Sequence, residues 1–299
     1  MAFEKVTRQR AKLRMALTGV SGAGKTLGAL YIAYGITNDW GKIALIDTEH
    51  ERARFYANRS DLGTGEFLYS SFAPPYSPDR YKALVTEGAA VVGPDGVVIV
   101  DSFSHAWNNE GGILDLKEKV AAQKGKNDYT AWNEAGKEQN ALVNSILSAD
   151  CHVIVTMRSK MEYALVENDR GKMEPRKMGL APIQRDNTEY EFDIVLDIAR
   201  NHIATASKDV TFLDRFGAVI TPGLGRDLAK WLNSGEAPAT GTACADCGKV
   251  IVNHQRMTAV KIIENTSKKF GRPLCWECAC EAGKQVKANA AATVSDGTH

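Results

Sequence analysis

The chain has 299 residues, enough for one large domain or two modest ones, and a domain of about 230 residues buries ~70% of the surface of its unfolded chain. Lys and Arg number 37 and Asp and Glu 36, so the net charge of +1 neither indicates nor excludes a nucleic-acid partner. No stretch approaches the ~20 apolar residues of a membrane span, and residues 1–5 lack an apolar signal region. We therefore expect a soluble, intracellular protein with no membrane partner.

The first motif is a glycine-rich segment between an apolar strand at 14–18 and a buried helix at 27–34. The glycines allow consecutive backbone N–H groups to face an anion, and the helix adds its positive N-terminal end. We predict a nucleotide site in which Lys25 contacts the β- and γ-phosphates and Thr26 holds Mg²⁺. The segment fits the phosphate-binding pattern G-x-x-x-x-G-K-[ST] at every fixed position: Gly19, Val20, Ser21, Gly22, Ala23, Gly24, Lys25 and Thr26.

Acidic residues end two further predicted strands. The strand at 42–46 leads into a polar segment that contains Glu49, and the β-branched run at 97–100 ends on Asp101. Open α/β sheets bind their ligands at the carboxyl ends of parallel strands, so both residues are placed to face the nucleotide. We predict Glu49 as the base that orients the attacking water and Asp101 as the Mg²⁺ partner.

The remaining pattern predicts an α/β protein with a mostly parallel sheet flanked by helices. Buried apolar runs and helical periodicity alternate along the chain. Strands are expected at 67–70, 151–157, 192–198 and 202–208, the last two antiparallel, and helices at 78–92, 113–120, 130–149 and 225–232.

Basic residues follow the strand at 151–157. Arg158 and Lys160 leave its carboxyl end, where cations can sense a γ-phosphate or contact DNA. Residues 158–177 carry six basic and four acidic side chains, with a hairpin tip expected at 167–172. This slight excess leaves two alternatives open, a solvated loop of mixed charge or a loop that contacts DNA.

The C-terminal part has the composition of a separate metal-binding module. Residues 234–243 are small and polar with Pro and Gly, which predicts a flexible linker after a core at 1–233. A zinc-ribbon-like module is expected at 244–283 and a disordered tail at 284–299. Four cysteines form two C-x-x-C pairs with the spacing of a structural zinc site, the alternative being a disulfide or redox pair: Cys244, Cys247, Cys275 and Cys278.

Two further residues near the cysteine pairs are candidates for lesser roles. Cys280 is a spare or substitute ligand, and His254 is interpreted as structural. Residues 244–287 carry eight basic and four acidic side chains, which favours nucleic acid as the partner of the module.

Three segments, in this order, resemble the RecA/RadA recombinase core: the phosphate-binding loop, residues 45–50 with Glu49, and the strand at 97–102. The likeness spans about residues 12–215. Further segments are similar to phage-encoded short RecA-like nucleotide-binding proteins, including the Sak-type single-strand annealing group: residues 156–160, 179–185 and 191–193.

The resemblance implies ATP-dependent binding of single-stranded DNA, often by a ring or filament of subunits, to promote annealing or strand exchange. By position, Glu49 would activate water, and Arg158 would couple the γ-phosphate to a DNA-binding loop at 162–190. Lys208 resembles basic residues that reach the phosphate of a neighbouring subunit. The chain has no room for the separate N-terminal domain of full-length recombinases, which favours annealing over autonomous exchange.

The leading hypothesis is therefore an Mg-ATP-dependent ATPase that binds single-stranded DNA in phage or bacterial recombination and repair. It would act as a homo-oligomer in the bacterial cytoplasm, with a single-strand-binding protein or a helicase as a further partner. The alternative is an ATP-switched adaptor or helicase loader that acts on a protein partner and docks through the zinc module. A nucleotide kinase is disfavoured, because no lid segment rich in phosphate-facing arginines is evident.

Overall fold

The computed structural model describes residues 6–167, 173–236, 242–251, 254, 257 and 259–283, without the side chains of 162–179 and 260. By its internal contacts the chain divides into two compact units. The larger unit is Ala11–Ser234, and the smaller one combines Met1–Arg10 with Gly235–His299.

The larger unit is built on a nine-stranded sheet in the order β3-β2-β4-β5-β1-β7-β8-β9, with β6 paired to β5 beside this path. Strands β1 to β5 and β7 run parallel, whereas β6, β8 and β9 are antiparallel to their neighbours. The strands are β1 (Arg14–Gly19), β2 (Ile43–Asp47), β3 (Leu68–Ser71), β4 (Val97–Asp101), β5 (His152–Glu167), β6 (Met173–Pro182), β7 (Ile194–Ile198), β8 (Ile203–Lys208) and β9 (Gly217–Val219).

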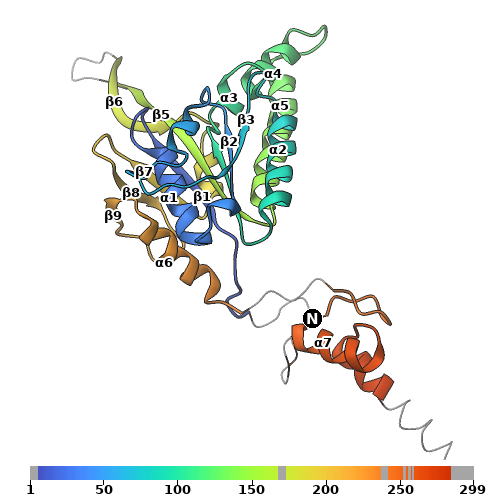
Figure 1. Cartoon of the computed structure of the whole chain (residues 1–299). Coiled ribbons are helices and arrows are strands. Elements are labelled where there is room, and N and C mark those ends of the chain that lie inside the picture. Colours follow the sequence, from blue (N-terminus) through green and yellow to red (C-terminus); the bar gives the residue numbers. More distant parts are fainter. Residues whose placement is uncertain are drawn as a thin grey trace, which may run out of the picture. The chain divides into compact units, whose positions relative to one another are not determined.

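Helices cover both faces of this sheet (Figure 1). Helices α1 and α6 pack on one face, and α2 and α5 on the other. The helices of the larger unit are α1 (Lys25–Thr37), α2 (Pro78–Val92), α3 (His105–Asn108), α4 (Ile113–Ala121), α5 (Asp128–Leu147) and α6 (Pro222–Asn233), with 3-10 turns η1 (Trp40–Lys42), η2 (Arg52–Tyr56) and η3 (Thr188–Glu191).

Alternate residues of the buried strands belong to two separate hydrophobic cores. On β1, Met15 and Leu17 pack with α1 and α6, whereas Ala16 between them packs with α2 and α5. Because both faces are covered by helices, the central strands are apolar at nearly every position instead of alternating with polar residues. The predicted α/β fold with a mostly parallel sheet flanked by helices is confirmed.

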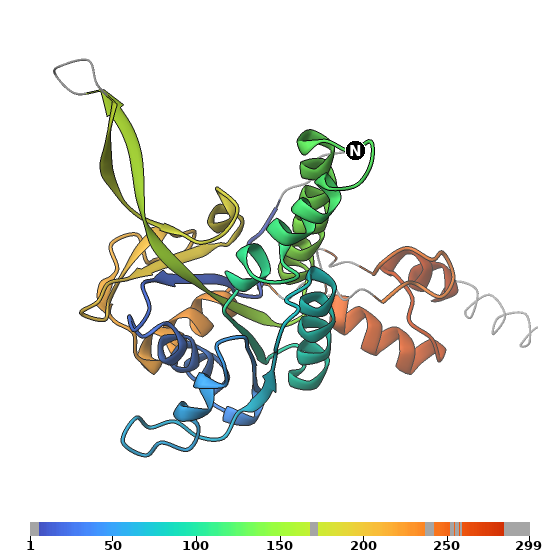
Figure 2. The same cartoon turned by 90° about the horizontal axis from the view of Figure 1, so that it is seen from above.

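Strand β5 continues well beyond the sheet. Up to Arg158 it pairs with β1, and from Ser159 onward it pairs with β6 as a two-stranded antiparallel ribbon. Figure 2 shows the ribbon projecting from the rest of the unit. The sequence predicted a strand that ended near Met157 and a loop with a hairpin tip at 167–172. The antiparallel pairing of Glu167 with Met173 agrees with a hairpin there, whereas the length of the paired strands is a correction. Of the expected hairpin tip, residues 168–172 lie outside the described part of the chain.

The smaller unit contains helix α7 (Ala259–Phe270) and a second helical segment at 276–283. A small core of buried apolar residues, including Ile251, Ile262 and Leu274, holds it together. Residues 237–241 of the expected linker and the expected tail at 284–299 lie outside the described residues. Among the helices that the structure describes, none combines the length and the apolar character that a membrane crossing requires.

Candidate functional site

The glycine-rich segment forms a turn between the end of β1 and the start of α1. Gly22 and Gly24 have φ values of 81° and 96°, in the left-handed region that glycine adopts without a steric penalty. Gly24 is the N-cap residue of α1, and no side chain caps this end of the helix. The free N–H groups of the first helical turn are therefore available to an anion.

Lys25 is the first residue of α1 and is buried at this turn. Its Nζ donates to the carbonyl oxygens of Gly19 at 2.9 Å and Val20 at 3.0 Å. Burial lowers the pKa of Lys25 below its ordinary value, and the carboxylates of Asp101 and Glu49 partly oppose that shift. The carbonyl oxygens of the phosphate-binding turn thus hold the Lys25 ammonium in place.

Thr26 and Asp101 lie together beside the turn. The Thr26 hydroxyl donates to Oδ2 of Asp101 at 2.6 Å, and the Thr156 hydroxyl donates to the other carboxylate oxygen. Asp101 is fully buried at the end of β4, and burial raises its pKa. Hard oxygen ligands of this kind suit Mg²⁺, so the donor set fits the ion that was expected here.

The segment after β2 is ordered by Asp47. One oxygen of this buried carboxylate accepts the N–H of Glu49 at 2.6 Å, and the other accepts the N–H of Ala53 at 3.0 Å. Tyr69 also donates to Asp47, at 3.2 Å. These bonds fix the turn that presents Glu49, a positioning role that the sequence alone did not assign to Asp47.

Glu49 and Arg158 form a two-bond ion pair. Nε of Arg158 donates to Oε1 of Glu49 at 2.6 Å, and Nη2 donates to Oε2. Burial pushes the pKa of Glu49 upward, but the hydrogen bonds and the charge of Arg158 outweigh it, so the pKa lies below its ordinary value. The same bonds raise the pKa of Arg158.

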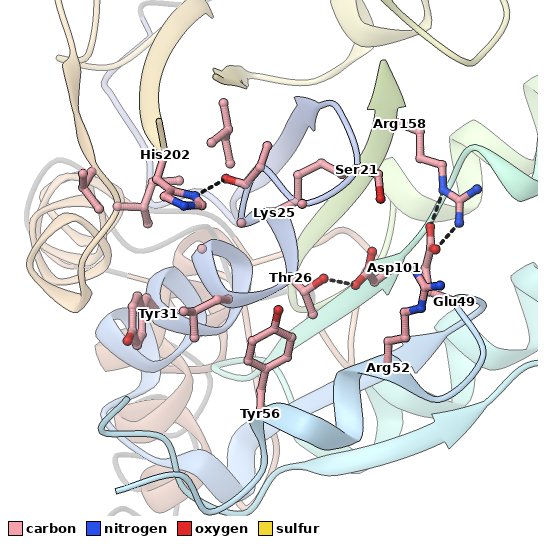
Figure 3. A pocket seen from close by; sticks show the side chains of 18 of the residues that line it. Ser21, Lys25, Thr26, Tyr31, Glu49, Arg52, Tyr56, Asp101, Arg158 and His202 are labelled. Carbon is pink, nitrogen blue, oxygen red and sulfur yellow. Dashed lines mark hydrogen bonds and ion pairs between the residues drawn. The ribbon is translucent and has the colours of Figure 1, made fainter. Parts of the chain in front are cut away.

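These residues line one pocket of about 650 Å³. Figure 3 shows Glu49 and Arg158 on one side of the pocket, with Thr26 and Asp101 next to them and His202 and Tyr31 on the opposite side. The volume falls in the range of small-molecule sites. The pocket extends from the phosphate-binding turn to a partly aromatic wall, which matches a ligand with a charged end and a flat end.

Several lining residues were not predicted from the sequence. Tyr31 comes from α1, Arg52 and Tyr56 from η2, and His202 from the turn between β7 and β8. Nδ1 of His202 lies 3.0 Å from the carbonyl oxygen of Ala23, so this nitrogen carries the proton. No local sequence pattern indicated Tyr56 or His202, because each reaches the pocket through the fold.

The structure does not bring Lys208 to this pocket. It ends β8, and its Nζ donates to the carbonyl oxygen of Tyr190. Within one chain, therefore, the pocket unites Lys25, Thr26, Glu49, Asp101 and Arg158 but not Lys208. The predicted contact of Lys208 with the phosphate of a neighbouring subunit stays a prediction.

A phosphate-binding turn between a parallel strand and a helix, with acids at the ends of two adjoining strands, defines a P-loop nucleotide-binding protein. The chain belongs to the AAA domain family AAA_24, which matches residues 11–216. The match covers most of the larger unit and supports a P-loop ATPase. A comparison with curated proteins finds no match.

The smaller unit contains a second candidate site, made of four cysteines. The sulfur atoms of Cys244, Cys247, Cys275 and Cys278 all lie within 4.8 Å of one another. All six cysteines of the chain are free thiols. Sγ of Cys247 lies 3.8 Å from Sγ of Cys275, close to the ~3.8 Å expected between thiolates bound tetrahedrally at ~2.3 Å from zinc.

The backbone supports both halves of this cysteine cluster. The N–H of Gly248 donates to the carbonyl oxygen of Cys244 at 2.9 Å and forms a tight turn around the first pair. The second pair lies at the start of the helical segment 276–283. A group of four cysteines at these distances is compatible with a structural zinc ion, and within the described residues neither Cys280 nor His254 joins the cluster. His254 instead stacks on Trp276, with ring centroids 4.2 Å apart.

Proposed function

We propose that this protein is an Mg-ATP-dependent ATPase that binds single-stranded DNA and promotes annealing in recombination or repair. In this proposal ATP occupies the pocket at the P-loop, where Lys25 contacts its phosphates. Thr26 and Asp101 hold Mg²⁺, which neutralises charge on the phosphate oxygens. Glu49 orients the attacking water, and Lys208 acts on the site of a neighbouring subunit.

The observation that carries the proposal is the position of Arg158. It lines the nucleotide pocket, and it is also the last residue of β5 that pairs with the sheet before the β5–β6 ribbon begins. In this proposal, the presence or absence of the γ-phosphate changes the position of Arg158, and Arg158 passes the change to the base of the β5–β6 ribbon. Residues 158–177 carry six basic and four acidic side chains, a slight excess that is compatible with phosphate contacts.

Like RecA-type recombinases, which the motifs resemble, the protein would assemble subunits along the strand. The basic C-terminal module would contribute a second contact, and a single-strand-binding protein or a helicase would be a further partner. The proposed activity is that of Sak-type annealing proteins of phages, and the bacterial cytoplasm would be the corresponding compartment.

The test is fluorescence anisotropy of a labelled oligothymidylate with the full-length protein in the absence of nucleotide, with ADP and with ATPγS. We expect tighter binding with ATPγS and an affinity that falls linearly on a log-log plot against salt concentration. Hydrolysis should be faster with the oligonucleotide than without it. Absence of binding at moderate salt in all three states would reject the DNA-binding proposal and leave the P-loop ATPase intact.

A second candidate is an ATP-switched adaptor with a protein partner. It is favoured by exposed aromatic residues at the start of α5, where Tyr129 is 75% exposed and Trp132 is 42% exposed. Trp132 also stacks with Trp107 of α3, with ring centroids 6.2 Å apart. ATPase activity that DNA leaves unchanged, together with loss of partner binding on removal of residues 240–299, would favour this candidate.

A further inference from the structure

Glu49 cannot act as a base in the arrangement that the structure shows. Both of its carboxylate oxygens accept hydrogen bonds from one guanidinium, that of Arg158. The Glu49 side chain is only 14% exposed, so little of the carboxylate is open to water. A carboxylate that is paired in this bidentate way binds a water proton poorly, because the guanidinium stabilises its charged, already satisfied form.

Arg158 is also placed to bind a second anion, the γ-phosphate of a bound nucleotide. Its side chain is 37% exposed and lines the pocket that contains the phosphate-binding turn. Guanidinium groups bind phosphate with the same two-pronged geometry that they use for carboxylate. A γ-phosphate in the pocket would therefore compete with Glu49 for Arg158.

His105 offers Glu49 another partner. Its Nε2 lies 3.9 Å from Oε1 of Glu49, and among the described residues only His105 and Arg158 bring a basic nitrogen within 4.0 Å of this carboxylate. The His105 ring is buried against Tyr76, with ring centroids 5.1 Å apart. Nδ1 of His105 is buried and has no hydrogen-bond partner in the described part of the chain.

The environment favours a neutral imidazole at this position. Burial lowers the pKa of His105 and the charge of Arg158 lowers it further, while the charge of Glu49 and a hydrogen bond to the backbone of Thr48 oppose the shift in part. Burial alone continues to favour the neutral ring when Arg158 leaves Glu49. A neutral ring with its proton on Nε2 presents one N–H to Glu49 and leaves Nδ1 as an acceptor. Such a donor orients a carboxylate without the full positive charge that makes Arg158 an inhibitor of its basicity.

We propose that Arg158 holds Glu49 in an inactive ion pair until a γ-phosphate draws the guanidinium away, and that His105 then positions the released carboxylate. This inference rests on the proposed ATPase function and deepens it. Arg158 acts as the sensor of the triphosphate, and His105 is a positioning residue that acts through Glu49. ADP lacks the γ-phosphate and leaves the ion pair intact.

The first test measures the binding of ATPγS and of ADP to the full-length protein by calorimetry. Because ATPγS binding has to break the ion pair, Glu49→Gln should raise the affinity for ATPγS about fivefold, or about 1 kcal/mol, and leave that for ADP unchanged. In an Arg158→Gln background the same substitution should produce no gain. Glu51→Gln removes an exposed partner of Arg54, 3.5 Å away, and serves as the matched control with no effect in either background.

The outcomes separate the inference from the proposed function. A gain for Glu49→Gln that is as large in the Arg158→Gln background indicates simple repulsion between Glu49 and the triphosphate and overturns the exchange of partners. An unchanged ratio of ATPγS to ADP affinity in Glu49→Gln overturns it as well. If the wild-type protein binds neither nucleotide, the ATPase proposal itself fails. Arg158→Lys keeps the positive charge but loses the two-pronged guanidinium geometry. In this background, Glu49→Gln should raise the affinity for ATPγS by an intermediate factor.

The second test concerns His105. His105→Phe keeps a ring against Tyr76 but removes the donor, and His105→Gln keeps a neutral N–H at a similar distance from the backbone. We expect kcat to fall about tenfold in His105→Phe with ATPγS affinity unchanged, and His105→Gln to recover most of the loss. Equal kcat in the wild type and His105→Phe, or no recovery in a folded His105→Gln, would assign His105 a packing role only.

Discussion

At the scale of single residues, the ammonium of Lys25 is already in place before a nucleotide arrives. It is held by two backbone carbonyls of the turn, Gly19 and Val20. We expect Lys25→Ala to weaken ATP binding at least ~100-fold, or ~3 kcal/mol, because charge-assisted bonds to phosphate are lost in a buried site. Calorimetry measures the change, and Lys42→Ala, at an exposed position of η1, should bind ATP normally.

Glu49 has a different role, so its substitution should produce a different defect. Glu49→Gln preserves the shape of the pocket and removes the base, so ATP should still bind while hydrolysis falls about 100-fold or more. Phosphate release under single-turnover conditions measures this. The neighbouring Glu51→Gln should hydrolyse ATP at the wild-type rate. Equal rates in Glu49→Gln and wild type would remove Glu49 from the catalytic role.

The sequence indicates the residues of the site that belong to local patterns. Lys25 and Thr26 follow from the glycine spacing, and Asp101 follows from an apolar run that ends on an acid. Arg52 and His202 have no such pattern, because each reaches the pocket through the fold: one from a 3-10 turn and the other from a turn between distant strands. The pairing of Glu49 with Arg158 is likewise a product of the strand order, which puts β5 between β4 and β1.

At the scale of elements, α1 and α6 approach each other through glycines. A Cβ atom on Gly35 would lie 2.2 Å from the carbonyl oxygen of Pro222 and 2.7 Å from Cα of Gly225. We expect Gly35→Ala to destabilise the larger unit by about 2 kcal/mol, since backbone cannot move aside as a side chain can. The Tm should fall by about 4–8 °C.

For a glycine in another helix, we expect substitution by Ala to increase stability. Gly136 lies within α5, and the nearest atom to its added Cβ is Nη1 of Arg185, at 3.9 Å. Gly136→Ala should therefore stabilise the protein by ~0.5–1 kcal/mol through helix propensity alone. A thermal melt of both variants checks the pair, and a destabilised Gly136→Ala would show that propensity does not decide stability at this position.

His152 joins the starts of β5 and β1. Its Nδ1 accepts the N–H of Leu13 at 2.9 Å, which requires the neutral ring, and burial lowers its pKa to about 4. The unfolded chain takes up this proton near its ordinary pKa of ~6.5, so the contribution to stability is complete above pH 6.5 and is lost as the pH falls towards 4. The full difference is about 3 kcal/mol.

Urea unfolding at pH 7.5 and pH 5 measures this effect. His152→Asn keeps an acceptor for Leu13 but does not titrate, so the variant should lose less stability between the two pH values than the wild type. Buried carboxyl groups titrate in both proteins, so their contribution to the pH dependence of stability cancels in the comparison. Equal losses would show that protonation of His152 does not contribute to acid sensitivity.

The parallel strands were predictable because burial on both faces produces continuous apolar runs, as in β4. The β5–β6 ribbon was not, because beyond Arg158 no sheet core dictates the sequence, and polar residues pair there as readily as they remain in a loop. Helix α7 was also missed: its apolar face, with Ile262, packs in a small core that includes Cys244. Sequence patterns predict the elements that a large core requires, and predict less in a small unit built around a cysteine cluster or in a free-standing ribbon.

At the scale of the whole molecule, the two units should differ in what stabilises them. The larger unit has two extensive hydrophobic cores, whereas the smaller one has few fully buried apolar side chains, among them Ile251 and Leu274. A core of that size supplies little folding free energy, so bound zinc would supply most of it. The units should therefore respond independently to loss of metal.

We expect Cys278→Ser to abolish stoichiometric zinc and to make residues 242–283 sensitive to protease, while ATP affinity and the Tm of the larger unit stay unchanged. Cys280→Ser is the matched control, because Cys280 is two positions along the same helical segment and lies outside the cluster. It should keep about one zinc per chain by metal analysis.

Affinity for oligothymidylate should fall in Cys278→Ser but not in Cys280→Ser, since only in Cys278→Ser is the basic surface of the smaller unit unfolded. Well under one zinc per chain in wild-type protein purified without chelator would reject the zinc site, and full ATPase activity in the same sample would show that the larger unit does not need it.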